Sequence, residues 1–203
     1  SGNVAAIASD IFVSNGDVYV VGYINRDASA MAQPAKAMLW KNSIPIELAM
    51  PNGATARALA VYVVAADVYV VGTIHRTGRA IPTLWKNGVG STIGDGDLSA
   101  YPHDIMVVGS DVYIAGYENN SGSNTAVYWK NNVRHALSKP EVNTFSTGIF
   151  VDGADVYVAG YADAETDQSV KYWKNGEEVI LPSGDIYSRT GSIVVDDGQV
   201  YVC

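Results

Sequence analysis

The sequence predicts an all-β protein built from repeats, and three observations lead to this prediction. A segment close to Asp-Val-Tyr-Val-x-Gly-Tyr, followed each time by Trp-Lys-Asn, recurs along the chain. The tryptophans of the repeat stand 45, 44 and 44 residues apart, and they are Trp40, Trp85, Trp129 and Trp173. A fixed period of this length is typical of a repeat architecture. The valine-rich runs, with 13 tyrosines against three phenylalanines, favour strands over helices.

Each repeat holds four short strand candidates, named strands A to D in chain order. In the third repeat, strand A is residues 105–108, strand B is 111–117, strand C is 126–130 and strand D is 133–137. The Asn-Gly pair at 87–88 has the backbone tolerance of a two-residue hairpin, so antiparallel strands are expected. Strands A and B are apolar at nearly every position, which indicates that both faces are covered. Strand D mixes polar and apolar residues, as expected for a strand at the outer edge of a sheet.

Four antiparallel strands in a unit of about 44 residues are typical of a β-propeller blade. We therefore expect one propeller domain over residues 1–203. Its units are expected at residues 4–53, 54–97, 98–141 and 142–185, with a two-stranded half unit at 186–203. Three arrangements fit this count: a five-bladed ring with an incomplete blade, a fragment of a larger propeller, or a ring that a second chain closes.

The repeat resembles a known kind of blade. The pattern Val-Tyr-Val-x-Gly-Tyr, a polar loop and Tyr-Trp-Lys-Asn-Gly is similar in layout to kelch-type blades. It more closely resembles the repeats of a largely uncharacterised group of bacterial β-propeller proteins. The resemblance covers nearly the whole chain, although Tyr or Thr replaces the second glycine of the kelch motif. It implies an exported or cell-surface bacterial protein, and it carries over no catalytic residues.

Composition limits the partners. The net charge of −8, from 21 acidic and 13 basic residues, opposes attraction to nucleic-acid phosphates and anionic membranes, so no nucleic-acid partner is expected. No apolar run reaches the 18 or so residues that a membrane span needs, and no membrane insertion is expected. The first three residues lack the features of a signal peptide, so the chain is either intracellular or has lost its signal. The single cysteine, Cys203, excludes an internal disulfide.

Residues that all repeats share are interpreted as scaffold. The tryptophans could offer stacking platforms for sugars, but packing between blades is the favoured interpretation. The lysines that follow them are interpreted as a solvated rim, and they are Lys41, Lys86, Lys130 and Lys174. The loop at residues 24–36 is five residues longer than its counterparts, which is interpreted as a tolerated insertion.

Candidate binding residues are sought where the repeats differ. Side chains that enter the innermost strand of a propeller blade converge near the central channel. The candidates of this kind are Arg57, Tyr101, His103, Asp104, Tyr187 and Arg189. Aromatic and arginine side chains together can hold a glycan or a peptide carboxylate. An ordinary polar rim is the alternative interpretation of these residues.

Metal and enzyme signatures are weak. His75, His103 and His135 lie in three repeats and are predicted in a B-to-C loop, a D-to-A loop and strand D, so they are not expected to share a zinc ion. Residues 163–167 imitate the start of a calcium loop, but Gln168 stands where that loop requires glycine. Residues 95–97 are predicted to form a turn. No nucleophile, phosphate-loop or dinucleotide motif is present, so no catalytic residue, metal or cofactor is assigned.

Two function classes remain. The first is a non-enzymatic binding or scaffold propeller that recognises a protein or a glycan through its loop-bearing face. The second is a hydrolase or lyase whose acid and base come from different blades, for example Asp104 with His103 or Glu118. Clustered buried acids would favour the enzyme, whereas an aromatic and arginine rim would favour binding.

The last strand is expected to mediate self-association. Strand B of the half unit, at residues 199–203, has no strand C after it in this sequence and exposes its edge beside apolar side chains. Pairing of two such edges would make a homodimer through Gln199, Val200, Tyr201, Val202 and Cys203. A disulfide is expected only under oxidising conditions. Truncation of a longer parent chain is the other expectation for this end.

Overall fold

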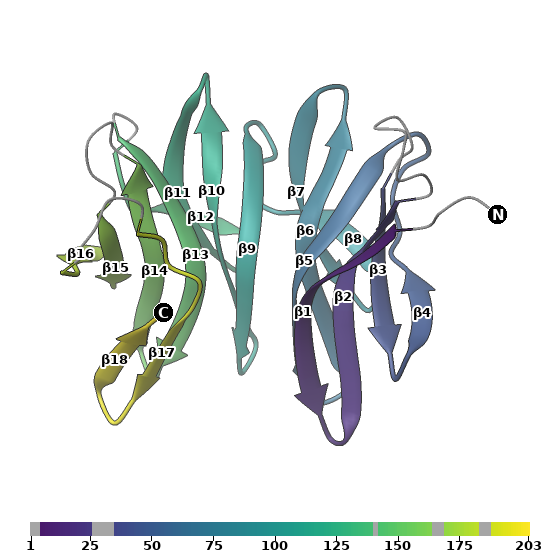
Figure 1. The fold of residues 1–203 in the computed structure, drawn as a ribbon, viewed down its shortest axis with the longest axis horizontal. Helices are drawn as coiled ribbons and strands as arrows, with labels where there is room; N and C mark the ends of the chain where they lie inside the picture. Colours follow the sequence, from purple (N-terminus) through teal and green to yellow (C-terminus); the bar gives the residue numbers. More distant parts are fainter. Residues whose placement is uncertain (1–4, 26–34, 140–141, 164–168, 183–187) are drawn as a thin grey trace. The chain divides into compact units, whose positions relative to one another are not determined.

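The computed structural model describes residues 5–25, 35–139, 142–163, 169–182 and 188–203, and its regular elements are β-strands (Figure 1). The chain divides into two compact units, Ser1–Asp97 and Leu98–Cys203, which are described one at a time. The described part of the chain contains no helix with the length and apolar character needed to cross a membrane.

The first unit contains two four-stranded sheets. Sheet 1 consists of β1 (Ala5–Ser14), β2 (Asp17–Asn25), β3 (Lys36–Lys41) and β4 (Ile44–Glu47). Sheet 2 consists of β5 (Thr55–Val64), β6 (Asp67–Arg76), β7 (Arg79–Lys86) and β8 (Val89–Thr92).

The second unit contains two further sheets and a hairpin. Sheet 3 consists of β9 (Ser99–Val108), β10 (Asp111–Asn120), β11 (Ser123–Lys130) and β12 (Val133–Ala136). Sheet 4 consists of β13 (Asn143–Asp152), β14 (Asp155–Asp163), β15 (Val170–Lys174) and β16 (Glu177–Ile180). The hairpin consists of β17 (Ile193–Asp196) and β18 (Gln199–Val202).

Each sheet is an antiparallel meander in chain order, which confirms the predicted succession of strands A to D. The four residues of β4, of β8 and of β16 are all exposed, as expected for an outer strand. At the turn from β7 to β8, Asn87 and Gly88 both have positive φ angles, of 51° and 82°. These angles match the two-residue hairpin that the Asn-Gly pair predicted.

Strand A is longer than the sequence predicted. In sheet 3 it begins at Ser99 and not at Ile105, because a β-bulge at His103 interrupts the pairing between β9 and β10. A bulge inserts one residue and shifts the alternation of side chains, so the apolar pattern that predicted strand A stops at this point. The same bulge occurs at Ser9, Leu59 and Thr147 in the other three sheets.

The bulge explains the glycine of the repeated segment. Strand A approaches strand B so closely beside the bulge that a Cβ on Gly116 would overlap the carbonyl oxygen of Tyr101. A Cβ on Gly72 would overlap the carbonyl oxygen of Arg57 in the same way. Glycine is the residue that permits such a close approach of two backbones.

The tryptophans pack as predicted, with one exception. Trp85, Trp129 and Trp173 are completely buried, whereas Trp40 is partly exposed. Trp85 belongs to a core cluster that joins sheets 1 and 2, and Trp173 to one that joins sheets 3 and 4. The β17–β18 hairpin covers β14 through Ile193 and Val195 (Figure 1). Apolar burial between neighbouring sheets is therefore the main source of stability within each unit.

A polar cluster, called the clamp, recurs where strand B begins. In sheet 2, Lys86 Nζ lies 2.8 Å from Asp67 Oδ2 and 5.0 Å from the ring centroid of Tyr69. The side-chain amide of Asn87 donates to Asp67 Oδ1 over 2.9 Å, and its oxygen accepts from the backbone N–H of Val68 over 2.9 Å. The lysines are half-exposed, as predicted, and each is also paired with the aspartate of its own repeat: Lys41 with Asp17, Lys130 with Asp111, and Lys174 with Asp155.

The β18 strand pairs with β17 in the described structure. Tyr201 is 59% exposed, and Val200 and Val202 are partly buried against the core of the hairpin. Self-association through residues 199–203 stays a prediction.

Candidate functional site

The candidate site lies at the end of sheets 3 and 4 where strand A begins and strand B ends, opposite to the clamp. Tyr101 of β9 pairs with Tyr117 of β10, and Phe145 of β13 pairs with Tyr161 of β14. The rings of the first pair stack with centroids 5.0 Å apart, and those of the second pair with centroids 4.9 Å apart. Phe145 meets Tyr117 edge-on at 4.8 Å, which joins the two pairs. We call these four residues the aromatic row.

Two further side chains extend the aromatic row. His103, placed by the bulge, stacks on Tyr117 with ring centroids 5.6 Å apart. At the other end, the guanidinium of Arg189 lies 5.4 Å from the ring centroid of Tyr161. The four rings of the row are partly buried, while His103 and Arg189 are exposed. The row is therefore a surface with apolar faces, phenolic hydroxyl groups and one cation.

Burial sets the protonation states in the row. It raises the pKa of Tyr117 to about 12, and the neighbouring Tyr101 and Tyr161 contribute in the same direction. Burial also raises the pKa of Tyr161, although Arg189 opposes the increase. Although His103 has an exposed surface, its ring is packed against Tyr117, and the protein around the ring lowers its pKa because it disfavours the imidazolium. At neutral pH the phenols of Tyr117 and Tyr161 therefore keep their protons and can donate hydrogen bonds, and the lowered pKa of His103 favours its neutral form.

Arg57 belongs to a separate group in the first unit. Its guanidinium lies 4.9 Å from the ring centroid of Tyr23. His75 lies within β6 and not in a loop as predicted, and its ring is 3.2 Å from the hydroxyl of the buried Thr73. Burial lowers the pKa of His75, and the charge of Arg57 adds to this effect.

Asp104 has a structural role that the sequence analysis did not predict. Its Oδ1 accepts from the backbone N–H of Ile105 over 2.8 Å, and its Oδ2 accepts from the N–H of Ile149 in sheet 4 over 2.8 Å. Asp10 makes the same two bonds in the first unit, to Ile11 and to Val61, each over 2.8 Å. These N–H groups belong to strand A, which lies at the edge of its sheet, and the carboxylate supplies their acceptor. Asp104 therefore ties two sheets together.

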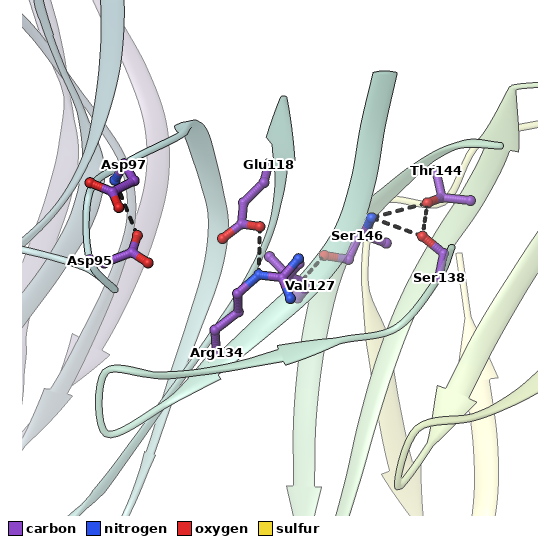
Figure 2. Close-up of polar contacts among 9 residues, drawn as sticks. Asp95, Asp97, Glu118, Val127, Arg134, Ser138, Thr144 and Ser146 are labelled. Carbon is purple, nitrogen blue, oxygen red and sulfur yellow. Dashed lines mark hydrogen bonds and ion pairs between the residues drawn. The ribbon is translucent and has the colours of Figure 1, made fainter. Parts of the chain in front are cut away.

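Glu118 forms an ion pair on the opposite face of β10 from the aromatic row. Its carboxylate is buried, and Oε2 lies 2.6 Å from Nε of Arg134 in β12 (Figure 2). Neighbouring residues in a strand point to opposite faces, so Glu118 points away from the side of Tyr117. The described contacts of Asp104 and Glu118 are structural, and an acid and base pair of Asp104 with His103 or Glu118 stays a prediction.

The remaining predicted sites divide into three groups. Tyr187 and residues 164–168 of the calcium-like segment lie outside the described residues. Residues 95–97 form the predicted turn, in which the N–H of Asp97 donates to Asp95 Oδ1 over 3.1 Å (Figure 2). His135 lies in strand D as predicted, where its ring stacks on Tyr128. Among the described residues, no group of three His, Cys, Asp or Glu side chains is arranged to hold a metal ion.

Sequence reasoning missed three members of the row. Tyr117 and Tyr161 end the repeated segment of strand B, which favours a scaffold interpretation. Phe145 is not among the predicted residues although it occupies the same repeat position as Tyr101. The sequence signal that could have identified them is that two repeat positions, one in strand A and one in strand B, are both aromatic in the same repeat. Residues paired across strands A and B at this end are aromatic in both sheets of the second unit.

The comparisons with known proteins identify the fold. No protein-family model matches the chain, and no curated protein is similar to it in sequence. Among solved structures, a GH32 β-fructofuranosidase of Bombyx mori matches 96% of this chain with a TM-score of 0.50 and 10% identity. A variant of that enzyme in complex with sucrose matches 96% with a TM-score of 0.51 and 10% identity. An exo-1,5-α-L-arabinanase from a bovine ruminal metagenomic library covers all of the chain and 89% of its own length, with a TM-score of 0.48 and 10% identity.

The chain has the β-propeller fold. Its four four-stranded antiparallel sheets and its two-stranded hairpin match five-bladed propeller glycosidases over nearly the whole chain. The predicted fold class is thereby confirmed, and the more specific resemblance to kelch-type or bacterial repeat proteins stays a prediction. The chain spans 55% of the length of the two β-fructofuranosidase chains.

Proposed function

We propose that the second unit binds a carbohydrate at the aromatic row, and that the chain acts as a binding propeller. The observation that carries this proposal is the continuous contact from Tyr101 through Tyr117 and Phe145 to Tyr161, with Arg189 at its end. Aromatic rings pack against the apolar faces of sugars, while protonated phenols and a guanidinium supply hydrogen-bond donors for hydroxyl or carboxylate groups.

The contacts of the acidic side chains near the row favour binding over catalysis. A glycosidase needs a carboxylic acid beside a second carboxylate, both facing the substrate. Asp104 accepts from two backbone N–H groups, and Glu118 is paired with Arg134 on the opposite face of β10.

A glycan array followed by calorimetric titration tests the proposal. Binding of an oligosaccharide by the wild-type chain should weaken by about tenfold or more in Tyr117→Leu and in Phe145→Leu, because leucine keeps apolar volume but removes the flat ring. Tyr128→Leu is the matched control, since its ring stacks on His135 away from the row. Equal binding by all three variants, or no binding to any glycan, would overturn the proposal.

Glycoside hydrolysis is the second candidate. It is supported by the names of the similar structures, which are a β-fructofuranosidase and its sucrose complex. Asp163 is an exposed carboxylate that ends β14, two residues after Tyr161, and it raises the pKa of that phenol after the larger effect of burial. Release of reducing sugar from oligosaccharides that is lost in Asp163→Asn, with binding retained, would favour the enzyme.

A further inference from the structure

A groove of about 520 Å³ lies between sheets 3 and 4, on the side of strands C and D. Its lining includes Leu137, Ser138 and Lys139, which follow the last strand of sheet 3, and Thr144, Lys171 and Glu178 of sheet 4. The groove shares no residue with the aromatic row, so an inference about the groove does not depend on the function proposed for that row.

The groove contains a buried cation. The side chain of Lys171 is only 8% exposed, and its Nζ lies 3.0 Å from Oε1 of Glu178, whose side chain is 40% exposed. An ammonium group has three N–H donors, and this bond uses one of them. Burial of a charged group is costly unless its donors find acceptors. Lys171 is therefore positioned to donate to a further acceptor.

The indole of Trp173 supplies a second unused donor. Its Nε1 is completely buried and has no hydrogen-bond partner among the described residues. The corresponding Trp85 in the first unit donates to the carbonyl oxygen of Ala49 over 2.7 Å. Buried indole N–H groups usually have an acceptor, so the absence of one beside Trp173 calls for an explanation.

The repeat places Trp173 behind Glu178, one of the residues that line the groove. Trp85 pairs with Gly90, and Trp173 occupies the same register opposite Glu178. A Cβ on Gly90 would lie 3.0 Å from Nε1 of Trp85, so the N–H edge of the indole faces the residue opposite it. In sheet 4 that residue is Glu178, which lines the groove.

Hydroxyl groups complete the polar surface. Ser138 and Thr144 hydrogen-bond to each other, and Oγ1 of Thr144 accepts from the N–H of Ala126 over 3.0 Å (Figure 2). One of the two hydroxyl protons is used in the bond between them, and the other can be donated. The groove thus offers an excess of donors over acceptors.

We propose that this groove binds a small organic carboxylate, whose oxygens accept hydrogen bonds from Lys171 and, where the ligand displaces Glu178, from the indole of Trp173 behind it. Charge-assisted hydrogen bonds of this kind are the strong ones, and apolar Leu137 accommodates the rest of the ligand. Glu178 is half-exposed and turns to water as the ligand takes its place beside Lys171. The equivalent groove of the first unit, about 340 Å³, has Thr83 and Gly90 at the positions of Lys171 and Glu178, and the cation in its lining is the exposed Arg76.

Nuclear magnetic resonance of the indole N–H groups tests the proposal, with 4-fluorobenzoate as the probe. The signal of Trp173, assigned by its loss in Trp173→Phe, should shift on titration, while the signal of Trp85 stays in place. 4-Fluorobenzyl alcohol, which lacks the carboxylate, should leave both signals unchanged. Lys171→Met should weaken the binding of the probe by about tenfold or more. Glu178→Gln should strengthen it, because it removes the competing carboxylate.

Three results would overturn the proposal: an unmoved Trp173 signal, an equal response to the alcohol, or unchanged binding in Lys171→Met. The other three indole signals report whether a variant is folded. Should Lys171→Met fail to fold, Lys171→Gln gives the same comparison with a polar side chain. If the ion pair between Lys171 and Glu178 were only structural, Glu178→Gln would not tighten binding of the probe. This variant therefore distinguishes a structural role of the pair from a role in ligand binding.

Discussion

Trp85 in the first unit and Trp173 in the second occupy the same position between paired sheets, yet only Trp85 has a described acceptor for its indole N–H. Both tryptophans are completely buried. The difference lies around them, where Lys171 and Glu178 of the second unit replace Thr83 and Gly90 of the first. Two repeats can therefore share a backbone and still present different side chains to equivalent grooves.

The other end of the sheets differs as well. In the first unit Arg57 lies over Tyr23, and in the second unit Phe145 lies against Tyr117 at the same repeat position. Because Tyr101 is also aromatic, the rings of the second unit form a row rather than an isolated pair. The shared clamp and bulge hold the backbone, and the positions that differ between units are free to specialise.

The largest expected effect tests whether the two units share one scaffold. Gly72→Ala and Gly116→Ala should each lower the free energy of unfolding by about 3 kcal/mol, because the new methyl group would overlap a backbone carbonyl oxygen of strand A. The control Gly88→Ala, in open space at a φ of 82°, should cost about 1 kcal/mol. Urea denaturation measures all three. Clearly unequal losses at residues 72 and 116 would break the equivalence of the units.

The next effect concerns the carboxylates at the bulges. Asp10→Ala and Asp104→Ala should each lower the free energy of unfolding by about 2 kcal/mol, because each leaves two backbone N–H groups without their acceptor. Carbohydrate binding by Asp104→Ala should match that of the wild-type chain, as measured by calorimetry. Loss of binding in a stably folded Asp104→Ala variant would return this residue to the binding site.

A smaller difference is expected between the two tryptophans. Trp85→Phe should cost about 1 kcal/mol more than Trp173→Phe, since both lose the same ring area but only the first loses a hydrogen bond and leaves the carbonyl of Ala49 unpaired. Chemical denaturation of both variants gives this difference. Equal costs would show that Trp173 has an acceptor of similar strength.

The smallest effect is the response of the clamps to pH, which should be the same in both units. Lys86 and then Asn87 lower the pKa of Asp67 from 3.8, and Asn131 and then Lys130 lower that of Asp111. A carboxyl whose pKa is lower in the folded than in the unfolded state stabilises the fold above its unfolded pKa. This stabilisation is lost as the pH falls through the folded pKa.

The thermal midpoint of the wild-type chain should therefore fall as the pH drops below 3.8. Asp67→Asn and Asp111→Asn should reduce this acid sensitivity slightly and equally, because both clamps are solvent-exposed. Thermal denaturation at several pH values measures the change. A steeper acid dependence in either variant would contradict this account of the clamps.

Much of the fold could be predicted because the repeat makes local signals appear several times. The Asn-Gly turn at 87–88 and the outer strand D are local features, and the structure agrees with both. The start of strand A could not be predicted, because the bulge at His103 breaks the alternation that identifies a strand. In the candidate site, Tyr101 was identified, whereas Tyr117 and Tyr161 were set aside because the other repeats have similar residues.

The sequence by itself determined the four sheets, their turns and the glycine beside each bulge, since these depend on residues within one repeat. The tertiary structure alone decided which side chains meet a neighbouring sheet, for example Asp104 with the N–H of Ile149, and the hydroxyl of Ser146 with the carbonyl oxygen of Val127. The physical reason is that strand periodicity specifies which face of a strand is covered, but not which atoms of the neighbouring sheet cover it.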